Sequence, residues 1–414
     1  MRILLWHGYL LGGTGSNVYT RALAREWSRA GHEVVVVCQE REPQRYDLGG
    51  AEVVNVELPG GLLPVFVMDR YAGLEPKFLQ DFTDAEKRAY VDANAAALRS
   101  LLPADLVFCN HVLMGAPVGA ASGGPFRVKA HGSELEYSMR GRPELGSWAA
   151  ETLARADATY VGSAHIREVL EDVVGHVDRV LEVPPGVDVD EFAPEDRATA
   201  LAALLAEAAA DPPNAGNANE RLPDEGNAGR LEAFLAGEAP TVVYVGKLIR
   251  EKGVHVLLEA MHGLDARLVV VGFGPYRADL ERAAPGRTLF TGPLEHRHLR
   301  HLLPLADAAV VPSVFPEAFG MVAAEAAAAG SPPIVARHSG LAEIAAGLEA
   351  AYPVPLRRLA AFESGDAADL RTKLEELLSL SRDERAQLGR AARRAVVDRW
   401  SWASVARRLL EPVA

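Results

Sequence analysis

The chain has 414 residues, more than a single hydrophobic core usually holds, so two domains are expected. Hydrophobic residues make up 49% and charged residues 24%, which is typical of globular proteins, and no apolar run approaches the roughly 20 residues that span a bilayer. The formal net charge of −13 argues against nucleic acid as a partner and leaves membrane contact at most peripheral, although a basic pocket could still bind a small anion.

The first segment, MRILLWHGYLLGGTG, combines one arginine with a short apolar run, as a signal peptide would. Its glycines fall where a strand passes into a loop, and no small-residue cleavage site follows, so we predict a first β-strand and a cytoplasmic protein. Cys38 and Cys109 each end a strand rich in valine or leucine, which predicts buried free thiols rather than a disulfide.

Short strands rich in valine, isoleucine and leucine alternate with amphipathic helical segments, and this alternation occurs twice. The first helical segment, NVYTRALAREWSRAG, is closed by Gly31. The pattern predicts two doubly wound α/β domains. The expected strands are RILLWH, EVVVVC, DLVFCN, FRVKAH and ATYVGS in the first half, and PTVVYVG, ARLVVVG, RTLFTG, DAAVVPS and SPPIVAR in the second.

A composition shift separates the two sets of strands. Residues 199–239 are rich in alanine, asparagine, proline and glycine, which predicts a mobile surface insertion; a solvated loop is favoured over a partner-binding segment. Near the C-terminus, Trp400 and Trp402 favour a helix packed on the core over one that lies on a membrane. The expected parts are a first domain over 1–195, a linker with the insertion over 196–240, a second domain over 241–395 and a C-terminal helix over 396–414.

Ligands of open α/β sheets bind beyond the carboxyl ends of the strands, so the residues at those ends are the first candidates for a binding site. The loop GGTGSN follows the first strand and opens a helix, and its glycines would let the backbone approach a phosphate. Its spacing does not match the dinucleotide fingerprint, which disfavours a nicotinamide dehydrogenase, and a glycine-rich turn without a ligand stays open. His131 ends a later strand, where a structural histidine is more usual than a catalytic one.

In the second half, Lys247 and Lys252 flank the loop that leaves the strand PTVVYVG. Two cations at such a loop can neutralise a diphosphate, although two solvated lysines would give the same pattern.

The stretch FPEAFGMVAAEAAAAG places Glu317 before a small apolar helix and Glu325 within its second turn. Helical geometry puts the two carboxylates roughly 8–12 Å apart. The free amides of Gly320, Met321 and Val322 at the start of the helix would form an anion site between them. The alternative is that both glutamates only form caps and salt bridges.

Eight motifs follow one another along the chain: GGTGSN, AHGSE, VPPGVDVDEF, YVGKLIREKG, VVVGFGP, FTGPL, PSVFPEAFGMVAAEAAAAGSP and SGLAEI. Taken together and in this order, they resemble the motifs of glycosyltransferase family 4. The resemblance runs from about residue 1 to residue 410 and is broken only by the insertion. It implies a GT-B fold, in which two Rossmann-like domains face each other across a substrate cleft, and retaining transfer from a nucleotide-diphosphate sugar without a metal or another cofactor.

The resemblance also implies roles for single residues. Glu317 matches the glutamate that contacts the donor sugar, Glu325 the one that binds the ribose, and Lys247 and Lys252 the basic pair on the diphosphate. His131 matches the histidine near C6 of the donor sugar, so Glu317, His131 and Lys252 are the expected catalytic residues. The remaining donor-binding positions are Phe319, Gly320, Met321 and Val322 in the sugar and phosphate loop, Leu294 at the base, and Gly13 or Gly15 in the first domain.

The chain departs from the family pattern at Ser339, which replaces the first of two expected glycines in SGLAEI. Asp188 and Asp190 form an Asp-x-Asp pair of the kind that binds metals, but the resemblance makes this segment structural, so no metal is predicted.

The implied function is a retaining hexosyltransferase that forms an α-glycosidic bond with an acceptor sugar, lipid-linked glycan or small metabolite, with a UDP-sugar favoured over a GDP-sugar as donor. A nucleotide-sugar epimerase or phosphorylase of the same fold, or a non-catalytic nucleotide-sugar-binding protein, stays open as an alternative. Acceptor groups are expected in the first-domain loops 61–82 and 134–142, where Arg140 and Arg142 could meet an anionic acceptor or simply be solvated.

Overall fold

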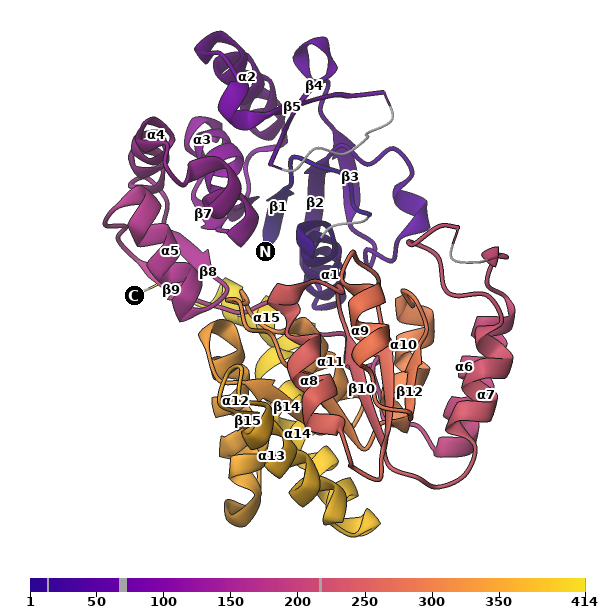
Figure 1. Ribbon diagram of the computed structural model, residues 1–414. Coiled ribbons are helices and arrows are strands. Elements are labelled where there is room, and N and C mark those ends of the chain that lie inside the picture. Colours follow the sequence, from indigo (N-terminus) through magenta and orange to yellow (C-terminus); the bar gives the residue numbers. More distant parts are fainter. Residues whose placement is uncertain (13–14, 67–72, 216–217, 414) are drawn as a thin grey trace. The chain divides into compact units, whose positions relative to one another are not determined.

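The computed structural model describes residues 1–12, 15–66, 73–215 and 218–413 (Figure 1). Two compact units make up the chain: the first comprises Met1–Gly186 and Trp402–Ala414, and the second comprises Val187–Ser401. The boundaries expected from the sequence differ from this division, because the residues from 187 to 240 and from 396 to 401 belong to the second unit. Within the described residues, no helix combines the length and the apolar character needed to cross a bilayer.

Seven parallel strands form the main sheet of the first unit, counted over its described residues, in the order β3-β2-β1-β6-β7-β8-β9. The five strands predicted from sequence are confirmed, whereas β3 and β9 are short and partly exposed and lacked an apolar run. A second, two-stranded sheet pairs β4 with β5. The bounds are β1 Arg2–Trp6, β2 Glu33–Cys38, β3 Glu52–Asn55, β4 Leu62–Val65, β5 Glu75–Phe78, β6 Leu106–Asn110, β7 Phe126–Lys129, β8 Ala158–Val161 and β9 Val180–Glu182.

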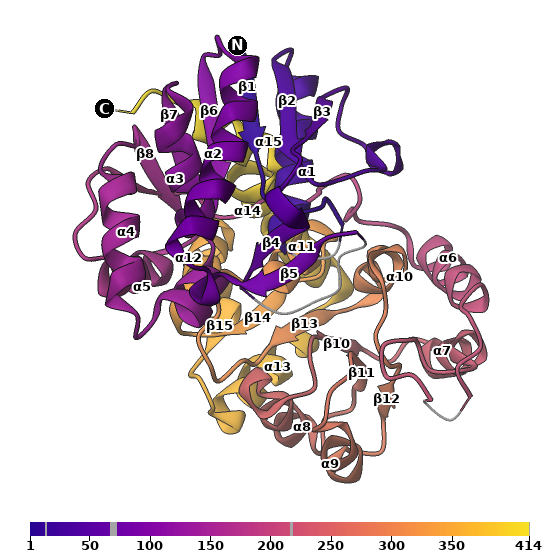
Figure 2. The same cartoon turned by 90° about the horizontal axis from the view of Figure 1, so that it is seen from above.

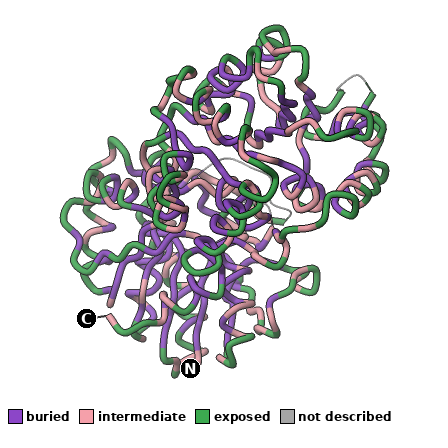
Figure 3. The backbone as a smooth tube through the Cα atoms, turned by 90° about the horizontal axis from the view of Figure 1, so that it is seen from below, coloured by how far each residue is buried: buried purple, intermediate pink, exposed green. Residues whose placement is uncertain are grey.

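Helices cover this sheet, and its five central strands, from β2 to β8 in the sheet order, are buried over most of their length (Figure 3). Helix α1 ends beside Gly31, whose φ of +85° explains why a glycine closes it. Cys38 and Cys109 are buried free thiols, as predicted. The helices are α1 Gly15–Arg29, α2 Asp84–Leu101, α3 Val112–Ser122, α4 Pro143–Leu153, α5 Ala164–Val174 and α15 Trp402–Leu410, with a π-helical turn over Glu134–Met139.

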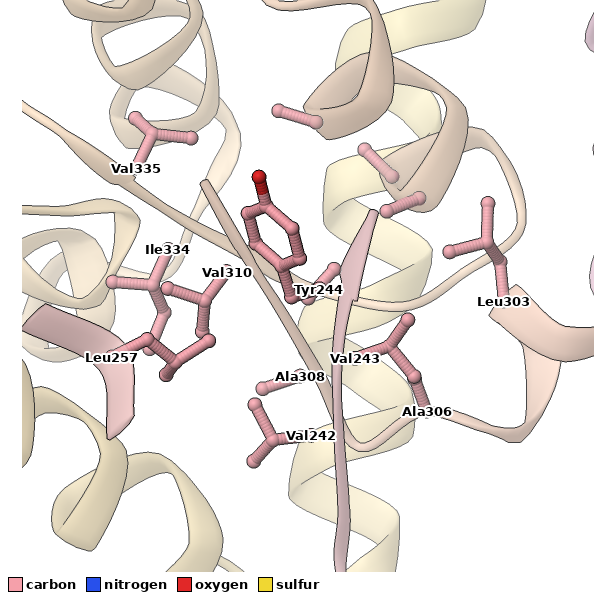
Figure 4. Packing of buried hydrophobic residues seen from close by; sticks show 14 of the residues in the cluster. Val242, Val243, Tyr244, Leu257, Leu303, Ala306, Ala308, Val310, Ile334 and Val335 are labelled. Atoms are coloured by element: carbon pink, nitrogen blue, oxygen red, sulfur yellow. The ribbon is translucent and has the colours of Figure 1, made fainter. Parts of the chain in front are cut away.

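Six parallel strands form the sheet of the second unit, again counting the described residues, in the order β12-β11-β10-β13-β14-β15. All five predicted strands are present, and only the two-residue β15 was missed. Side chains alternate across β10: Figure 4 shows Val243 beside Ala306 and Leu303, and Val242 on the opposite side of the strand. The bounds are β10 Thr241–Val245, β11 Arg267–Val271, β12 Thr288–Phe290, β13 Ala308–Val311, β14 Pro333–Ala336 and β15 Ala361–Phe362.

The C-terminal region forms two helices rather than one. Ser401 is extended, with φ −65° and ψ 146°, and separates α14 from α15. Trp400 and Trp402 are each 5% exposed, so the prediction that they pack on a core is confirmed. The helices of the second unit, apart from those in the insertion, are α8 Val254–Met261, α9 Arg277–Ala283, α10 His296–Leu302, α11 Met321–Ala328, α12 Ser339–Ala351, α13 Ala367–Ser379 and α14 Arg382–Trp400.

The insertion is folded, so its interpretation as a mobile surface segment is wrong for most of its length. It contains α6, Arg197–Ala209, and α7, Asn227–Leu235. Ala200, Leu204 and Leu231 are fully buried in the core of the second unit, which explains why the helices pack instead of staying solvated. Figures 1 and 2 both show α6 and α7 at the edge of the second sheet that carries β12, with α6 beside α10.

Candidate functional site

The strand order of the second unit reverses between β10 and β13, which is where doubly wound sheets bind their ligands. The loops that follow these two strands touch each other. Gly253 has a φ of +66°, and a Cβ atom there would lie 1.8 Å from the carbonyl oxygen of Pro312. The amide of Val314 donates to the carbonyl of Glu251 at 2.9 Å. A glycine is therefore required for the close approach of the two loops that hold the predicted site.

The two loops bring Lys252 and Glu317 together. Lys252 Nζ lies 2.5 Å from Glu317 Oε1, and Ser313 Oγ donates to the same oxygen at 2.8 Å. The side chain of Lys252 is 33% exposed and that of Glu317 is 20% exposed. Both bonds fall on Oε1, and within the described residues no side chain donates to Oε2, which leaves that oxygen able to accept from a ligand.

Lys247 lies on the same loop and is exposed. Its carbonyl accepts from the hydroxyl of Tyr244 at 2.9 Å, and burial together with the nearby Glu317 carboxylate raises the pKa of that phenol. Over the described part of the chain, the ammonium of Lys247 forms no ion pair. The predicted basic pair therefore consists of one lysine already held by a carboxylate and one that is available to an anion.

The backbone of Glu317 is held by the start of the SGLAEI segment, a contact that the sequence did not predict. The amide of Glu317 donates to Ser339 Oγ at 2.8 Å, and its carbonyl accepts from the amide of Gly340 at 2.9 Å. His338 Nε2 lies 2.6 Å from the carbonyl of Ser313 and so donates to it, which leaves Nδ1 of the neutral ring to accept from Ser339 Oγ at 2.9 Å. Ser339 and His338 thus connect both ends of the loop that carries Glu317.

Helix α11 begins at Met321, as predicted, and no side chain in the described residues caps it. The amides of Met321 and Val322 consequently face the loop as free donors at the positive end of the helix. Gly320 has a φ of +120°, and Phe319 packs edge-on against the ring of Trp400 at 5.8 Å. The side chain of Phe319 is therefore structural, and only the backbone of this segment is left to meet a ligand.

Glu325 lies in the second turn of α11 and is 7% exposed. Burial raises the pKa of this carboxyl, and the imidazole of His296 opposes that shift. His296 Nε2 lies 3.9 Å from Glu325 Oε1, and among the described residues no group donates a hydrogen bond to the carboxylate. A buried carboxylate without a donor is costly, so this one is poised to accept hydrogen bonds from a ligand.

Leu294 is 8% exposed and packs in the core of the second unit, two residues before His296. Its side chain packs beneath the loop that follows β12, so any contact of Leu294 with a base would come from its backbone.

In the first unit, three histidines follow three adjacent strands: His7 after β1, His111 after β6 and His131 after β7. The ring centroids of His111 and His131 are 4.7 Å apart, and those of His111 and His7 are 5.9 Å apart. Burial lowers the pKa of all three, that of His7 to about 4, so the cluster is neutral at pH 7. Of the three, only His131 was predicted. His7 and His111 also follow the carboxyl ends of strands, where ligands of open α/β sheets bind, so the same argument would have identified them.

His131 is held in one tautomer by Asn110. Its Nε2 lies 2.9 Å from Asn110 Oδ1, an oxygen that only accepts, so the neutral ring carries its proton on Nε2 and offers Nδ1 as an acceptor. The backbone amide of His131 donates to Glu134 Oε1 at 3.1 Å. Glu134 is fully buried and also accepts from the amide of Val112 at 2.8 Å; burial raises its pKa to about 7 although these donors oppose the shift.

The glycine-rich loop is anchored by Asn17, whose Oδ1 pairs with His7 Nε2 at 2.8 Å and whose amide nitrogen donates to the carbonyl of Gly12. Gly15 is exposed and opens α1, and a Cβ atom there would meet nothing within 4 Å. Gly13, the alternative for the phosphate-approaching glycine, lies outside the described residues.

Two further predicted groups have structural roles. Arg140 pairs with Glu136 and Asp172, each at 2.7 Å, so its guanidinium is already neutralised and is not a free site for an anionic acceptor. Asp188 Oδ1 accepts from the amides of Asp190 and Glu191 at 3.1 and 2.9 Å, which agrees with a structural reading of the Asp-x-Asp pair. Across the described ranges, no three His, Cys, Asp or Glu side chains gather as metal ligands would.

Comparison with known proteins assigns the family. Residues 14–186 match the model described as "Glycosyl transferase 4-like domain", and residues 231–395 match the one described as "Glycosyl transferases group 1". The chain belongs to glycosyltransferase family 4. The fold is GT-B: a solved structure of Anabaena HepE in complex with UDP superposes with a TM-score of 0.67, covering 99% of this chain and 98% of that one at 15% identity.

Curated relatives match over parts of their length. A sulfoquinovosyl transferase of Arabidopsis thaliana is 34% identical over 167 residues, which are 40% of this chain and 31% of the relative. A D-inositol 3-phosphate glycosyltransferase of Xylanimonas cellulosilytica is 34% identical over 208 residues, 46% of this chain and 43% of the relative. This family member thus spans less than half of the length of these relatives.

Proposed function

We propose that this family 4 member transfers a sugar from a nucleoside-diphosphate donor to an acceptor hydroxyl, with retention of the α configuration and without a metal. The arrangement around α11 carries the proposal: the uncapped helix amides lie between Glu317 and Glu325 along the chain, Lys252 pairs with Glu317, and Lys247 lies on the same loop as Lys252. Amides and lysines suit a diphosphate, whereas a buried carboxylate without a donor suits the hydroxyls of a ribose or a sugar. A UDP-sugar is the favoured donor, because solved structures of the same fold hold UDP and UDP-glucose.

In the proposed reaction, Glu325 accepts hydrogen bonds from the ribose and Glu317 Oε2 from the donor sugar. Lys247, Lys252 and the amides at the start of α11 stabilise the negative charge that develops on the diphosphate as the bond from the sugar C1 to phosphate oxygen breaks. The acceptor oxygen bonds to C1 from the same face and gives its proton to the departing phosphate. His131 keeps the role that the resemblance implies, contact with the C6 group of the donor sugar.

Binding and transfer test this proposal separately. Thermal-shift and calorimetric titrations with UDP-, GDP- and ADP-sugars identify the donor, since a ligand that binds the folded form raises its midpoint. Glu317→Gln should weaken binding of the nucleotide sugar by roughly tenfold or more, the value of a charge-assisted hydrogen bond, and should leave UDP binding nearly unchanged. Lys252→Ala should weaken the binding of both the nucleotide sugar and UDP.

A matched control is Asp307→Asn, which removes another partly buried ion pair of the second unit, that with Arg385 at 3.0 Å. This variant should bind both the nucleotide sugar and UDP with the affinity of the unmodified protein. Transfer is then followed with an acceptor panel, and donor incubated alone reveals an epimerase. The proposal fails if no nucleoside diphosphate sugar binds, or if Glu317→Gln and Lys252→Ala both transfer sugar at the rate of the unmodified protein.

A further inference from the structure

The second half of the insertion is bonded to the loop that follows β12, residues 291–294. The carbonyl of Thr291 accepts two hydrogen bonds from the insertion: one from the amide of Asp224 at 2.9 Å and one from Asn227 Nδ2 at 2.8 Å. Thr291 is fully buried and Asn227 is 1% exposed. Both lone pairs of one loop carbonyl are thus used by a segment that the sequence suggested to be a solvated loop.

The insertion also packs closely against the backbone of this loop. Gly292 has a φ of +69°, and a Cβ atom there would lie 2.6 Å from Asp224 Oδ1 and 3.2 Å from the carbonyl oxygen of Leu222. Any side chain at this position would push the insertion away. The amide of Gly272, which follows β11, donates to the carbonyl of Gly292 at 2.9 Å, so the loop is held from both sides.

Asp224 ties this contact to a third segment. Arg277 at the start of α9 donates to both of its carboxylate oxygens, at 2.9 and 2.6 Å, and Arg230 of α7 adds a bond at 3.3 Å. Asp224 is 8% exposed, and buried bidentate pairs of this kind hold their partners in one geometry. Arg230 also donates to the carbonyl of Phe290 at 2.7 Å, at the end of β12.

The loop held in this way leads directly to the donor site. Leu294 is followed two residues later by His296, whose ring lies 3.9 Å from the buried carboxylate of Glu325. If Glu325 binds the ribose, as the proposed function has it, the base attached to that ribose lies close to the 291–296 segment.

We propose that Asp224 and Asn227 are positioning residues that fix the conformation of loop 291–294 and thereby set which nucleotide base the protein prefers. This inference rests on the proposed function. The insertion then has a role: its helices α6 and α7 anchor the buried segment around Asp224 and Asn227, and this segment holds loop 291–294 in one conformation.

Isosteric variants test the inference. Asn227→Asp replaces the N–H donor that faces the Thr291 carbonyl with an acceptor, and Asp224→Asn weakens the pairing with Arg277. Dissociation constants for UDP, GDP, ADP and inorganic pyrophosphate are measured by calorimetry. Base preference is expressed as the dissociation constant of the weakest-binding nucleotide divided by that of the tightest-binding one. Each variant should reduce this ratio by about threefold to tenfold, the range of one ordinary hydrogen bond. Pyrophosphate, which has no base, should bind unchanged.

The control is Arg197→Gln, which loosens the same insertion at its other end, where Arg197 donates to the carbonyl of Leu235 at 3.0 Å. It should lower the melting midpoint without changing the base ratio. If the unmodified protein prefers one base and Asn227→Asp and Asp224→Asn keep that preference, the inference is wrong while the proposed function stands. An unmodified protein that binds the nucleotides without preference also overturns the inference, and one that binds none of them overturns both.

Discussion

Ser339→Gly restores the residue that the family pattern expects and separates two opposing effects. Ser339 has a φ of +46°, a conformation that costs a non-glycine residue about 1–2 kcal/mol, whereas glycine loses about 0.5–1 kcal/mol more in backbone entropy on folding. Backbone relief alone would therefore stabilise the second unit by about 0.5–1 kcal/mol. The substitution also removes the hydroxyl between the amide of Glu317 and the ring of His338.

Each of these two hydrogen bonds has a net value of about 1 kcal/mol, so the variant should lose about 2 kcal/mol and gain less than 1. The expected result is a net destabilisation of about 1 kcal/mol, measured by urea unfolding of the unit. Because Glu317 loses one of the bonds that hold its backbone, affinity for the nucleotide sugar should also fall relative to that for UDP.

Arg179→Gly is the matched control. Arg179 has a φ of +51°, is exposed, and makes no side-chain hydrogen bond within the described residues, so only the backbone effect applies. It should stabilise the first unit by about 0.5–1 kcal/mol. If Ser339→Gly stabilises its unit as Arg179→Gly does, and the sugar-to-UDP affinity ratio is unchanged, the hydrogen bonds assigned to Ser339 do not hold Glu317.

Two further predictions concern stability. Burial lowers the pKa of the Lys129 ammonium from 10.5 to about 7, so the unfolded chain binds more protons than the folded one between pH 7 and pH 10.5. The free energy of unfolding of the first unit should therefore rise with pH over this range, by up to about 1.4 kcal/mol per pH unit. The variant Lys129→Met should flatten this pH dependence. A slope equal in both proteins would contradict the assignment. Gly253→Ala should destabilise the second unit by at least about 2 kcal/mol through its positive φ and the contact with Pro312, whereas Gly286→Ala, with nothing within 4 Å, should leave it unchanged or up to about 1 kcal/mol more stable. Urea unfolding of both variants measures the difference, and equal effects would refute it.

The sequence predicted those parts of the fold that depend on local patterns. The predicted strands of both sheets, the glycine that ends α1 and the start of α11 after Gly320 are all encoded within a few residues. The same holds for Glu317 in its loop and Glu325 in the second turn of the helix, because both placements follow from where α11 begins.

Contacts between distant segments could not be predicted in this way. The bond between Glu317 and Ser339 joins residues 22 positions apart, and the pairing of Asp224 with Arg277 spans 53 positions. The richness of the insertion in alanine and other small residues also led to a wrong prediction. Alanine-rich α6 was interpreted as solvated, although alanine has the highest helix propensity and Ala200 is fully buried.

The two sheets reverse their strand order at equivalent places, yet the groups there differ in charge. In the second unit the reversal between β10 and β13 presents lysines, carboxylates and uncapped amides. In the first unit the reversal between β1 and β6 presents neutral imidazoles and asparagine amides in a buried cluster, which can exchange hydrogen bonds with a hydroxyl but offers no charge to an anion. In the proposed transfer, the charged groups of the second unit suit an anionic diphosphate donor, and the neutral groups of the first unit suit an uncharged hydroxyl. Introducing a carboxyl group into the first cluster, as in Asn110→Asp, should therefore lower the free energy of unfolding in urea several times as much as introducing one at the exposed Ala96 of α2, as in Ala96→Asp, because burying the charged form is costly.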